Sequence, residues 1–388
     1  MPSTLFRLPF LNPPQPALHL ERYPARKRDS LQAWDAADEL LLEEAYRLIR
    51  SWSAAPSPRI LILQDTFGAL TVGLREYSPT SVSDSFVSQE AIRRNLQANP
   101  GSGGPQLLRP LEADWGRSTT PPPFDLVLIR IPKNQSYFED LLHRLSFWIH
   151  SETKIVCGIM VKHQAKSSFE LLQKIIGPTH TSLASKKARL IFARPSQPAT
   201  PTPHPKTIRL EGFPKDFLHH AHLFSRERLD IGTRFFLDHL PQDLPQGRIL
   251  DLGCANGIIG IRTQELNPKT ELIFSDDSSH AVASAQENYS TYFPGKKAQF
   301  LWLNCFEGQP AGSVDWVLCN PPFHQENRVG DDIARQMFRD AHASLRAGGK
   351  LRIVGNRHLG YLSILNRIFG NATLLAQNSK FMILESTR

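Results

Sequence analysis

Cysteine is scarce in this chain of 388 residues, and its distribution excludes two kinds of stabilising site. Cys157, Cys254, Cys305 and Cys319 form no CxxC pair and have no histidine at zinc-ligand intervals. We therefore expect neither a disulfide framework nor a metal site. The pattern is typical of a reduced, cytoplasmic protein.

Long apolar runs and acidic residues are also in short supply. No apolar run approaches the ~18 residues of a membrane span, and proline repeatedly interrupts the first thirty residues, where a signal peptide would need an apolar core. We expect neither a membrane span nor secretion. The 45 Lys and Arg exceed the 37 Asp and Glu, which gives a net charge of +8. This balance favours a polyanionic partner such as nucleic acid, although a basic enzyme with a small substrate remains an alternative.

The two halves of the chain repeat one pattern, in which an apolar strand runs into a turn and then a helix-like segment. Residues 59–70, RILILQDTFGAL, resemble residues 248–259, RILDLGCANGII. Residues 124–133, FDLVLIRIPK, likewise parallel residues 314–323, VDWVLCNPPF. The length also suggests two domains. Similar strands would occur in any two α/β domains, but with either interpretation both halves are α/β.

A proline-rich stretch separates the halves. Residues 195–207, PSQPATPTPHPKT, contain five prolines in thirteen residues and predict a semi-extended linker. We place the first domain at 1–194, the linker at 195–207 and the second domain at 208–388.

In the second half, a short buried strand leads into a glycine turn and a helix, which is the pattern of a nucleotide cradle. The glycines allow the backbone to approach a ligand closely, and the helix N-terminus offers unpaired N–H groups to a carboxylate. The candidate ligand-binding residues of this turn are Asp251, Gly253, Cys254, Ala255, Asn256 and Gly257.

A second strand ends in Asp276 and Asp277. An acidic residue at this point can accept hydrogen bonds from both ribose hydroxyls of a nucleoside cofactor, and Asp276 is the first choice. Up to this residue the pattern fits NAD nearly as well as S-adenosylmethionine.

The strand VDWVLC and the tetrad Asn320-Pro321-Pro322-Phe323 favour S-adenosylmethionine, because the tetrad resembles the NPP(F/Y/W) motif of amino-group methyltransferases. An exocyclic amine is a poor nucleophile while its lone pair is delocalised into the base. An Asn320 amide oxygen and a Pro321 carbonyl that accept its two protons would favour a pyramidal nitrogen. Proline fixes that carbonyl, and Phe323 would stack on a base held out of its helix.

Other residues occupy expected positions around this site. Asn304 follows a strand and could contact the adenine, or could merely form a turn. Asp230, Gly232 and Thr233 precede the first strand and could close over the methionine end. The histidines at 219, 220 and 222 lack partners at metal-ligand spacing, so we interpret them as part of a polar loop.

Four segments extend the resemblance over nearly the whole chain. LQAWDAADELLL at 31–42, FSRERLDIGTRFF at 224–236, CNPPFHQ at 319–325 and GNRHLGY at 355–361 resemble the bacterial large-subunit ribosomal RNA guanine-N2 methyltransferase family. A small-subunit family is its sister and shares its plan.

This resemblance implies that S-adenosylmethionine methylates the exocyclic amino group of one guanine in large-subunit (23S) ribosomal RNA. It also implies two tandem Rossmann-like class I methyltransferase domains, of which the N-terminal one is degenerate. In the first half Ile62 and Gln64 replace Asp251 and Gly253, and RIPK replaces NPPF. The chain departs from the family at Ala255, where a middle glycine is usual; a requirement for positive φ there would put cofactor affinity in doubt.

A half without its chemistry can still bind substrate. Between Lys154 and Arg194 there are eight Lys or Arg and one acidic residue, which suits phosphate contacts. We assign RNA capture to Lys186, Lys187 and Arg189; a solvated face on a structural domain is the alternative. For the whole protein, the alternatives are methylation of small-subunit (16S) RNA, methylation of a protein glutamine, and a non-catalytic role in ribosome assembly.

Overall fold

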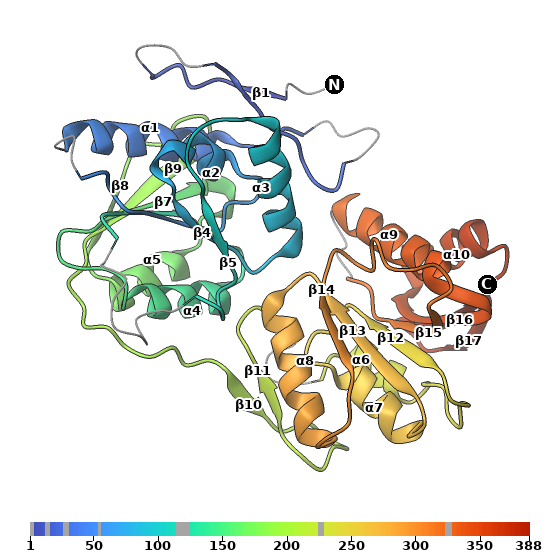
Figure 1. Cartoon of the computed structure of the whole chain (residues 1–388). Helices are drawn as coiled ribbons and strands as arrows, with labels where there is room; N and C mark the ends of the chain where they lie inside the picture. The colour runs from blue at the N-terminus through green and yellow to red at the C-terminus, as the bar shows by residue number, and fades with distance from the viewer. Residues whose placement is uncertain are drawn as a thin grey trace. The chain divides into compact units, whose positions relative to one another are not determined.

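The chain forms two compact units, Met1–His204 and Pro205–Arg388, each with a mixed sheet between helical layers (Figure 1). The computed structural model describes residues 4–11, 16–25, 31–52, 56–113, 124–223, 229–322 and 328–388, without the side chains of 328–331. The predicted α/β class is confirmed in both units.

Unit 1 is built on a seven-stranded sheet in the order β5-β4-β3-β6-β7-β9-β8. A small β1–β2 hairpin precedes it. The strands are β1 (Leu5–Phe6), β2 (Leu18–His19), β3 (Ile60–Leu63), β4 (Thr80–Val82), β5 (Gln106–Leu108), β6 (Leu126–Arg130), β7 (Lys154–Met160), β8 (Thr179–Thr181) and β9 (Ala188–Ala193). The helices are α1 (Ala36–Ser51), α2 (Ala69–Gly73), α3 (Phe86–Ala98), α4 (Gln135–Leu145) and α5 (Lys166–Ile175).

Unit 2 repeats this plan with the order β14-β13-β12-β15-β16-β18-β17, and the hairpin β10–β11 opens it. The strands are β10 (Lys206–Ile208), β11 (Phe217–His219), β12 (Arg248–Leu252), β13 (Glu271–Asp276), β14 (Gln299–Trp302), β15 (Val314–Cys319), β16 (Leu345–Asn356), β17 (Thr373–Gln377) and β18 (Phe381–Thr387). The helices are α6 (Ile231–Leu237), α7 (Ile258–Leu266), α8 (Ser279–Tyr292), α9 (Arg328–Ser344) and α10 (Tyr361–Phe369).

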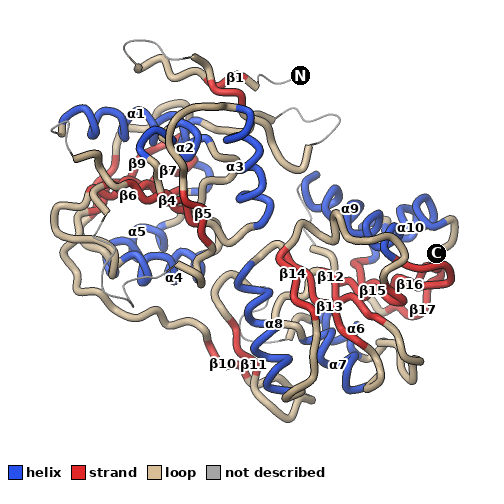
Figure 2. The backbone as a smooth tube through the Cα atoms, in the orientation of Figure 1, coloured by secondary structure: helices blue, strands red, loops and turns tan. Residues whose placement is uncertain are grey.

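Alternation along the central strands places a separate core on each face of each sheet. In β12, Ile249 packs in the core lined by residues of α6, α7 and α8, whereas Leu250 and Leu252 pack in the core lined by residues of α9 and α10. Figure 2 labels these helices beside the strands of the sheet. Strands buried on both faces are mostly apolar, as parallel strands between two helical layers require, and in β12 the buried exception is Asp251. This arrangement leaves only the ends of the strands free to build a site.

The registers of the two sheets identify equivalent residues. Leu63 pairs with Ile129 in unit 1, and Leu252 pairs with Cys319 in unit 2. The next residues, Arg130 and Asn320, therefore occupy the same position in the two units. The first five strands of each order pair in parallel, and the last two pairings of each order are antiparallel, which supports the duplication predicted from the sequence.

In the segment expected as a linker, 195–207, residues 195–205 contain no helix or strand, whereas Lys206 and Thr207 belong to β10, so the predicted end of the linker was wrong. Part of it is nevertheless fixed to unit 1. Ser196 N–H donates to the carbonyl of Ile176 at 2.9 Å, and the Thr202 hydroxyl donates to Asp140 at 2.6 Å. The chain then enters unit 2 through β10.

Candidate active site

The candidate site lies at the carboxyl edge of the unit 2 sheet. The parallel strands β12, β13 and β15 end there at Leu252, Asp276 and Cys319, and the predicted residues follow or end these strands. Ligands of open α/β sheets bind at this edge, where loops from neighbouring strands converge.

The turn after β12 requires glycine at two points. Gly253 and Gly257 have φ angles of 77° and 80°, in the left-handed region that favours glycine. A Cβ on Gly257 would lie 3.1 Å from the Cα of Ala285 in α8, so this residue also allows close packing. Gly253 and Cys254 donate their N–H groups to the Ser275 carbonyl, which fixes the turn to β13.

Ala255 occupies the same turn with a φ of 48°. The position where the family usually carries glycine is therefore left-handed, and alanine adopts this conformation at a cost of about 1–2 kcal/mol. The Ala255 N–H donates to Asp276 Oδ2 at 3.0 Å, which helps to hold the residue there.

Asp251 is fully buried in β12 beneath the turn. Its Oδ2 accepts the Gly260 N–H of α7 at 2.8 Å, and its Oδ1 is buried without a hydrogen-bond partner. Burial raises the pKa of Asp251 to about 8, and the nearby charge of Asp276 adds to this effect. An unpartnered buried carboxyl oxygen beside a nucleotide-type turn offers a hydrogen-bonding atom to a polar ligand group.

Asp276 and its neighbours occupy the edge next to the turn. Besides Ala255, the Asp276 carboxylate accepts the Ser278 N–H at 2.9 Å. A carboxylate at the end of this strand can also accept hydrogen bonds from ribose hydroxyls. The Asp277 carbonyl accepts the Trp302 indole N–H at 2.6 Å, while the Asn304 amide donates to Glu307 at 2.7 Å.

Asn320 directly follows β15 and has one amide atom engaged. Its Nδ2 donates to the Thr233 hydroxyl at 2.9 Å, whereas its Oδ1 is buried without a partner. A buried polar atom with no bond is uncommon and indicates a missing donor. An amino group of a substrate is such a donor.

The start of α6 fixes this orientation. Asp230 caps α6, because its carboxylate accepts the Thr233 N–H at 3.0 Å. Gly232 allows close packing, since a Cβ there would lie 2.9 Å from the Phe381 ring. The sequence interpretation assigned Asp230, Gly232 and Thr233 to the cofactor, but the structure connects Thr233 to Asn320.

The remaining tetrad residues are only partly covered by the structure. Pro321 is buried and Pro322 is half-buried. Phe323 lies outside the described residues.

A polar network that the sequence did not predict supports the glycine turn. The Asn256 amide nitrogen contacts His219 Nε2 at 2.6 Å, and Asn288 of α8 bonds the Asn256 carbonyl and both backbone groups of Leu218. Burial lowers the pKa of His219 to about 4, so the ring is neutral and its Nε2 can accept. The polar-loop interpretation was wrong for His219, which is buried in β11.

In unit 1 the equivalent positions are filled by the protein itself. Gln64, with a φ of 67°, replaces Gly253 and donates its side-chain amide to the buried Tyr137 hydroxyl. Arg130, in place of Asn320, forms two 2.8 Å bonds to Asp35 and lies 3.4 Å from Asp38. Although burial opposes it, these carboxylates raise the pKa of Arg130.

The residues expected to capture RNA differ in exposure. Lys186 and Lys187 are exposed in a left-handed turn, with φ angles of 48° and 63°. Lys186 forms a 2.5 Å ion pair with Glu39. Arg189 is half-buried in β9, and its Nε is buried.

Within the part of the chain that the structure describes, no group of three or more His, Cys, Asp or Glu is placed to hold a metal ion. Among the helices described, none is both long and apolar enough to span a membrane.

Comparison with known proteins matches both units. Residues 9–197 match the RLMG N-terminal domain, and residues 215–385 match the methyltransferase small domain. The chain is 43% identical to a ribosomal RNA large subunit methyltransferase G of Pseudomonas paraeruginosa over 98% of this chain and 100% of that protein. It is 42% identical to one of Streptomyces avermitilis, over 97% and 98%.

Among solved structures, a T. thermophilus 16S rRNA N2 methyltransferase, RsmC, in complex with AdoMet and guanosine has the same fold. Its TM-score is 0.74 at 20% identity, covering 96% of this chain and 95% of that one. The full-length similarity in sequence shows that this chain belongs to the ribosomal RNA large subunit methyltransferase G family.

Proposed function

We propose that this protein transfers a methyl group from S-adenosylmethionine to the exocyclic N2 amino group of a guanine in large-subunit (23S) ribosomal RNA. The observation that carries the proposal is the unpartnered Oδ1 of Asn320, held beside the glycine turn. The two relatives that match over nearly their full length are both named ribosomal RNA large subunit methyltransferase G, which supports the RNA substrate. The same relatives support a place in the bacterial cytoplasm.

The residues at the carboxyl edge fit S-adenosylmethionine, which supplies an electrophilic methyl group on a sulfonium. The turn from Gly253 to Gly257 would hold the methionine end, and Asp276 would accept the ribose hydroxyls. Asp277 and Asn304 would lie beside the adenine. The unpartnered Oδ1 of Asp251 adds a hydrogen-bonding atom beneath the turn.

Asn320 and Pro321 would act on the substrate. Asn320 Oδ1 would accept a hydrogen bond from one amino N–H and the Pro321 carbonyl would accept one from the other, which would localise the nitrogen lone pair for attack on the methyl carbon as its bond to sulfur breaks. The methylated amine would then lose one of its protons. Thr233 keeps the Asn320 amide nitrogen occupied, so that the oxygen stays available. Pro322 would stiffen the loop, and Phe323 would stack on the guanine.

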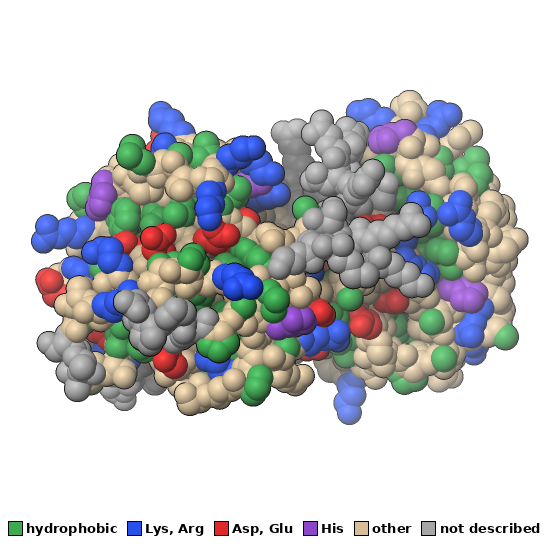
Figure 3. Space-filling view, turned by 90° about the horizontal axis from the view of Figure 1, so that it is seen from above, with side chains coloured by type: hydrophobic (Ala, Val, Ile, Leu, Met, Phe, Trp, Pro, Cys, Tyr) green, Lys and Arg blue, Asp and Glu red, His purple; other side chains and the backbone are tan. Residues whose placement is uncertain are grey.

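Unit 1 would capture RNA without taking part in methyl transfer. Its exposed Lys187 and Lys186 support phosphate contact, and Arg189 contributes less because it is half-buried. On the face that Figure 3 shows, Lys and Arg side chains lie over both units. Changing Lys186 and Lys187 to Ala should flatten the salt dependence of RNA binding; an unchanged salt slope would remove this turn from the RNA footprint.

The proposed reaction is tested by incubating the protein with tritiated S-adenosylmethionine and separated 23S and 16S RNA. We expect N2-methylguanosine from 23S RNA alone. Asn320→Ala should abolish labelling while S-adenosylmethionine still binds. Label in 16S RNA would overturn the substrate, and the absence of label would favour a protein glutamine substrate or a non-catalytic role.

A further inference from the structure

The loops after β16 and before β18 place two exposed cations at the carboxyl edge of the sheet, where Asn320 lies. Arg357 begins the short helical turn Arg357–Leu359 after β16, and Lys380 precedes β18. A backbone hydrogen bond of 3.0 Å from Arg357 N–H to the Lys380 carbonyl joins the two loops. Both side chains are exposed.

The position of this pair relative to Asn320 follows from the sheet register. Cys319 of β15 pairs with Ile353 of β16, so Arg357 lies four residues beyond the pairing point and Asn320 one. β16 ends at Asn356, which at ~3.3 Å per residue is about 7 Å further along the strand direction than Asn320, and Arg357 follows it directly. This length corresponds to about two nucleotides at ~3.4 Å each, so a phosphate near a base at Asn320 comes within range.

Unit 1 repeats the arrangement. Val161 N–H donates to the Lys187 carbonyl at 2.8 Å, as Arg357 does to Lys380, and the helical turn Val161–His163 follows β7. Lys187 and Lys380 therefore occupy the same position in the two units. A lysine is present at this position in both units, although Asn320 of unit 2 is replaced by Arg130 in unit 1. The lysine therefore does not depend on the residue that would contact the substrate amine.

The charges of this pair are available to a ligand. Within the described part of the chain, neither Arg357 nor Lys380 forms an ion pair, whereas Arg352 of the same strand is bound to Glu385 at 2.5 Å. Exposed cations without an acidic partner, at the edge where a base must be held out of its helix, suit phosphodiester groups, which position nucleic acid.

We propose that Arg357 and Lys380 form an RNA-backbone site that grips phosphates flanking the nucleotide held by Asn320. The inference rests on the proposed function, and it assigns residues that position the RNA for that reaction. Arg357 and Lys380 are positioning residues, because neither touches the reacting atoms. Their loss should weaken RNA binding without changing the binding of S-adenosylmethionine.

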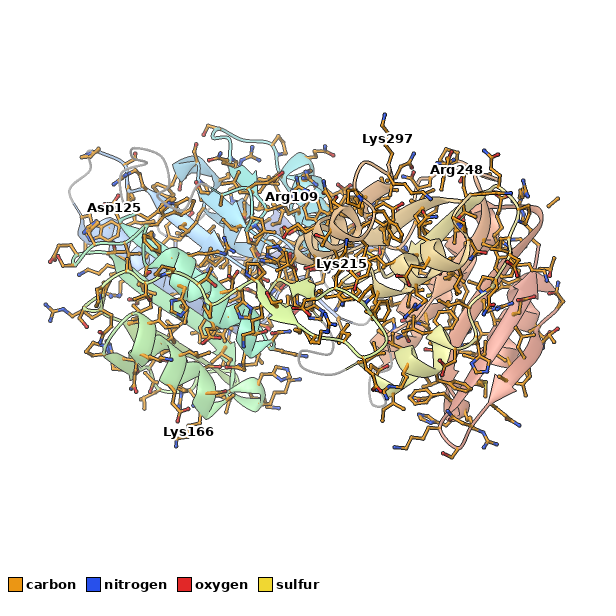
Figure 4. All side chains as sticks on the ribbon, turned by 90° about the horizontal axis from the view of Figure 1, so that it is seen from below. Arg109, Asp125, Lys166, Lys215, Arg248 and Lys297 are labelled. Atoms are coloured by element: carbon orange, nitrogen blue, oxygen red, sulfur yellow. The ribbon has the colours of Figure 1, made fainter. Side chains whose placement is uncertain are left out.

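The test compares two double variants with equal loss of charge. Arg357→Ala with Lys380→Ala removes the proposed site, and Lys269→Ala with Lys297→Ala removes exposed cations that precede β13 and β14, at the opposite edge (Figure 4). Binding of a 23S RNA fragment is measured by fluorescence anisotropy across a salt series. Methyl transfer and S-adenosylmethionine affinity are measured for the same proteins.

We expect the first variant to reduce the magnitude of the negative slope of log K against log salt by about 1.4, from two contacts at ~0.7 each, and the second to leave it unchanged. The KM for RNA should rise while kcat at saturating RNA is retained. Equal slopes in both variants, with a native protein that methylates 23S RNA, would overturn this inference alone. A native protein that methylates no RNA would overturn the proposed function.

Discussion

At the scale of single residues, the structure answers the question that Ala255 raised in the sequence. Its φ of 48° shows that the position is left-handed, so the missing glycine has a physical consequence. The turn keeps its shape because the Ala255 N–H binds Asp276 and because Gly253 and Cys254 bind the Ser275 carbonyl. The strain resides in the turn that we assign to the cofactor.

Ala255→Gly should therefore stabilise the protein. Relief of left-handed strain of about 1–2 kcal/mol is partly offset by the greater freedom of glycine in the unfolded chain, about 0.4–1 kcal/mol. We expect the free energy of unfolding in urea to rise by up to about 1.6 kcal/mol. Ala283→Gly, within α8, is the control and should lose about 0.5–1 kcal/mol. If both variants lost the same free energy of unfolding, Ala255 would not be strained in the native turn.

The buried carboxyl of Asp251 should make stability depend on pH. Its pKa is about 8 in the folded protein and near 3.8 in an unfolded chain, so between these values the folded state holds a proton that the unfolded state has lost. Its contribution to stability is full below pH ~4 and falls by up to ~1.4 kcal/mol per pH unit as the pH rises to ~8.

Asp251→Asn isolates this effect, because an amide oxygen can still accept the Gly260 N–H. Denaturant unfolding of both proteins is measured at pH 5 to 7.5. The free energy of unfolding of the variant should rise relative to that of the native protein as the pH rises. Other buried acids, such as Asp38, cancel in the comparison. A constant difference across this range would mean that Asp251 is ionised in the folded protein.

At the scale of elements, the first turn of α6 controls the end of β15. Thr233 accepts the Asn320 amide N–H, and Asp230 fixes Thr233 by capping the helix. Without this contact the amide could rotate, and its nitrogen would repel the amino group that its oxygen should accept. The helix thus sets which amide atom faces the substrate.

Thr233→Val keeps the shape and removes the hydroxyl. We expect kcat for RNA methylation to fall by about 10- to 100-fold, as misplaced catalytic groups do, with S-adenosylmethionine affinity retained. Single-turnover transfer and calorimetric titration measure the two quantities. Thr233→Ser, which restores the hydroxyl, should recover most of the rate. If affinity falls instead of rate, Thr233 belongs to the cofactor site, as its place in the sequence first suggested.

Prediction from sequence succeeded where a feature depends on neighbouring residues. The glycine turn, the acid after β13 and the tetrad after β15 each follow a strand directly, so periodicity and turn residues locate them. Contacts between distant residues were not predictable in this way. His219 and Asn256 are 37 residues apart, and Thr233 and Asn320 are 87 apart. Only the fold brings these pairs together.

At the scale of the whole molecule, two units of one topology carry different chemistry at the same positions. The neutral contact between Thr233 and Asn320 in unit 2 is replaced in unit 1 by the ionic contacts of Arg130 with Asp35 and Asp38. Arg130 and Asp35 lie 95 residues apart, so the sequence showed that the tetrad was lost but not what took its place. The replacement fills the position instead of leaving it open.

This difference predicts that the protein binds one S-adenosylmethionine per chain. In unit 1, Gln64 replaces Gly253 and its side chain is bonded to Tyr137, while Ser83 follows β4 where Asp276 ends the equivalent strand β13. Isothermal titration calorimetry should give a stoichiometry near one. Gly257→Val should abolish the binding heat, because its side chain would meet Ala285 of α8. Gln64→Ala, the control in unit 1, should leave heat and stoichiometry unchanged; two sites in the native protein, or heat lost in this control, would show that unit 1 still binds the cofactor.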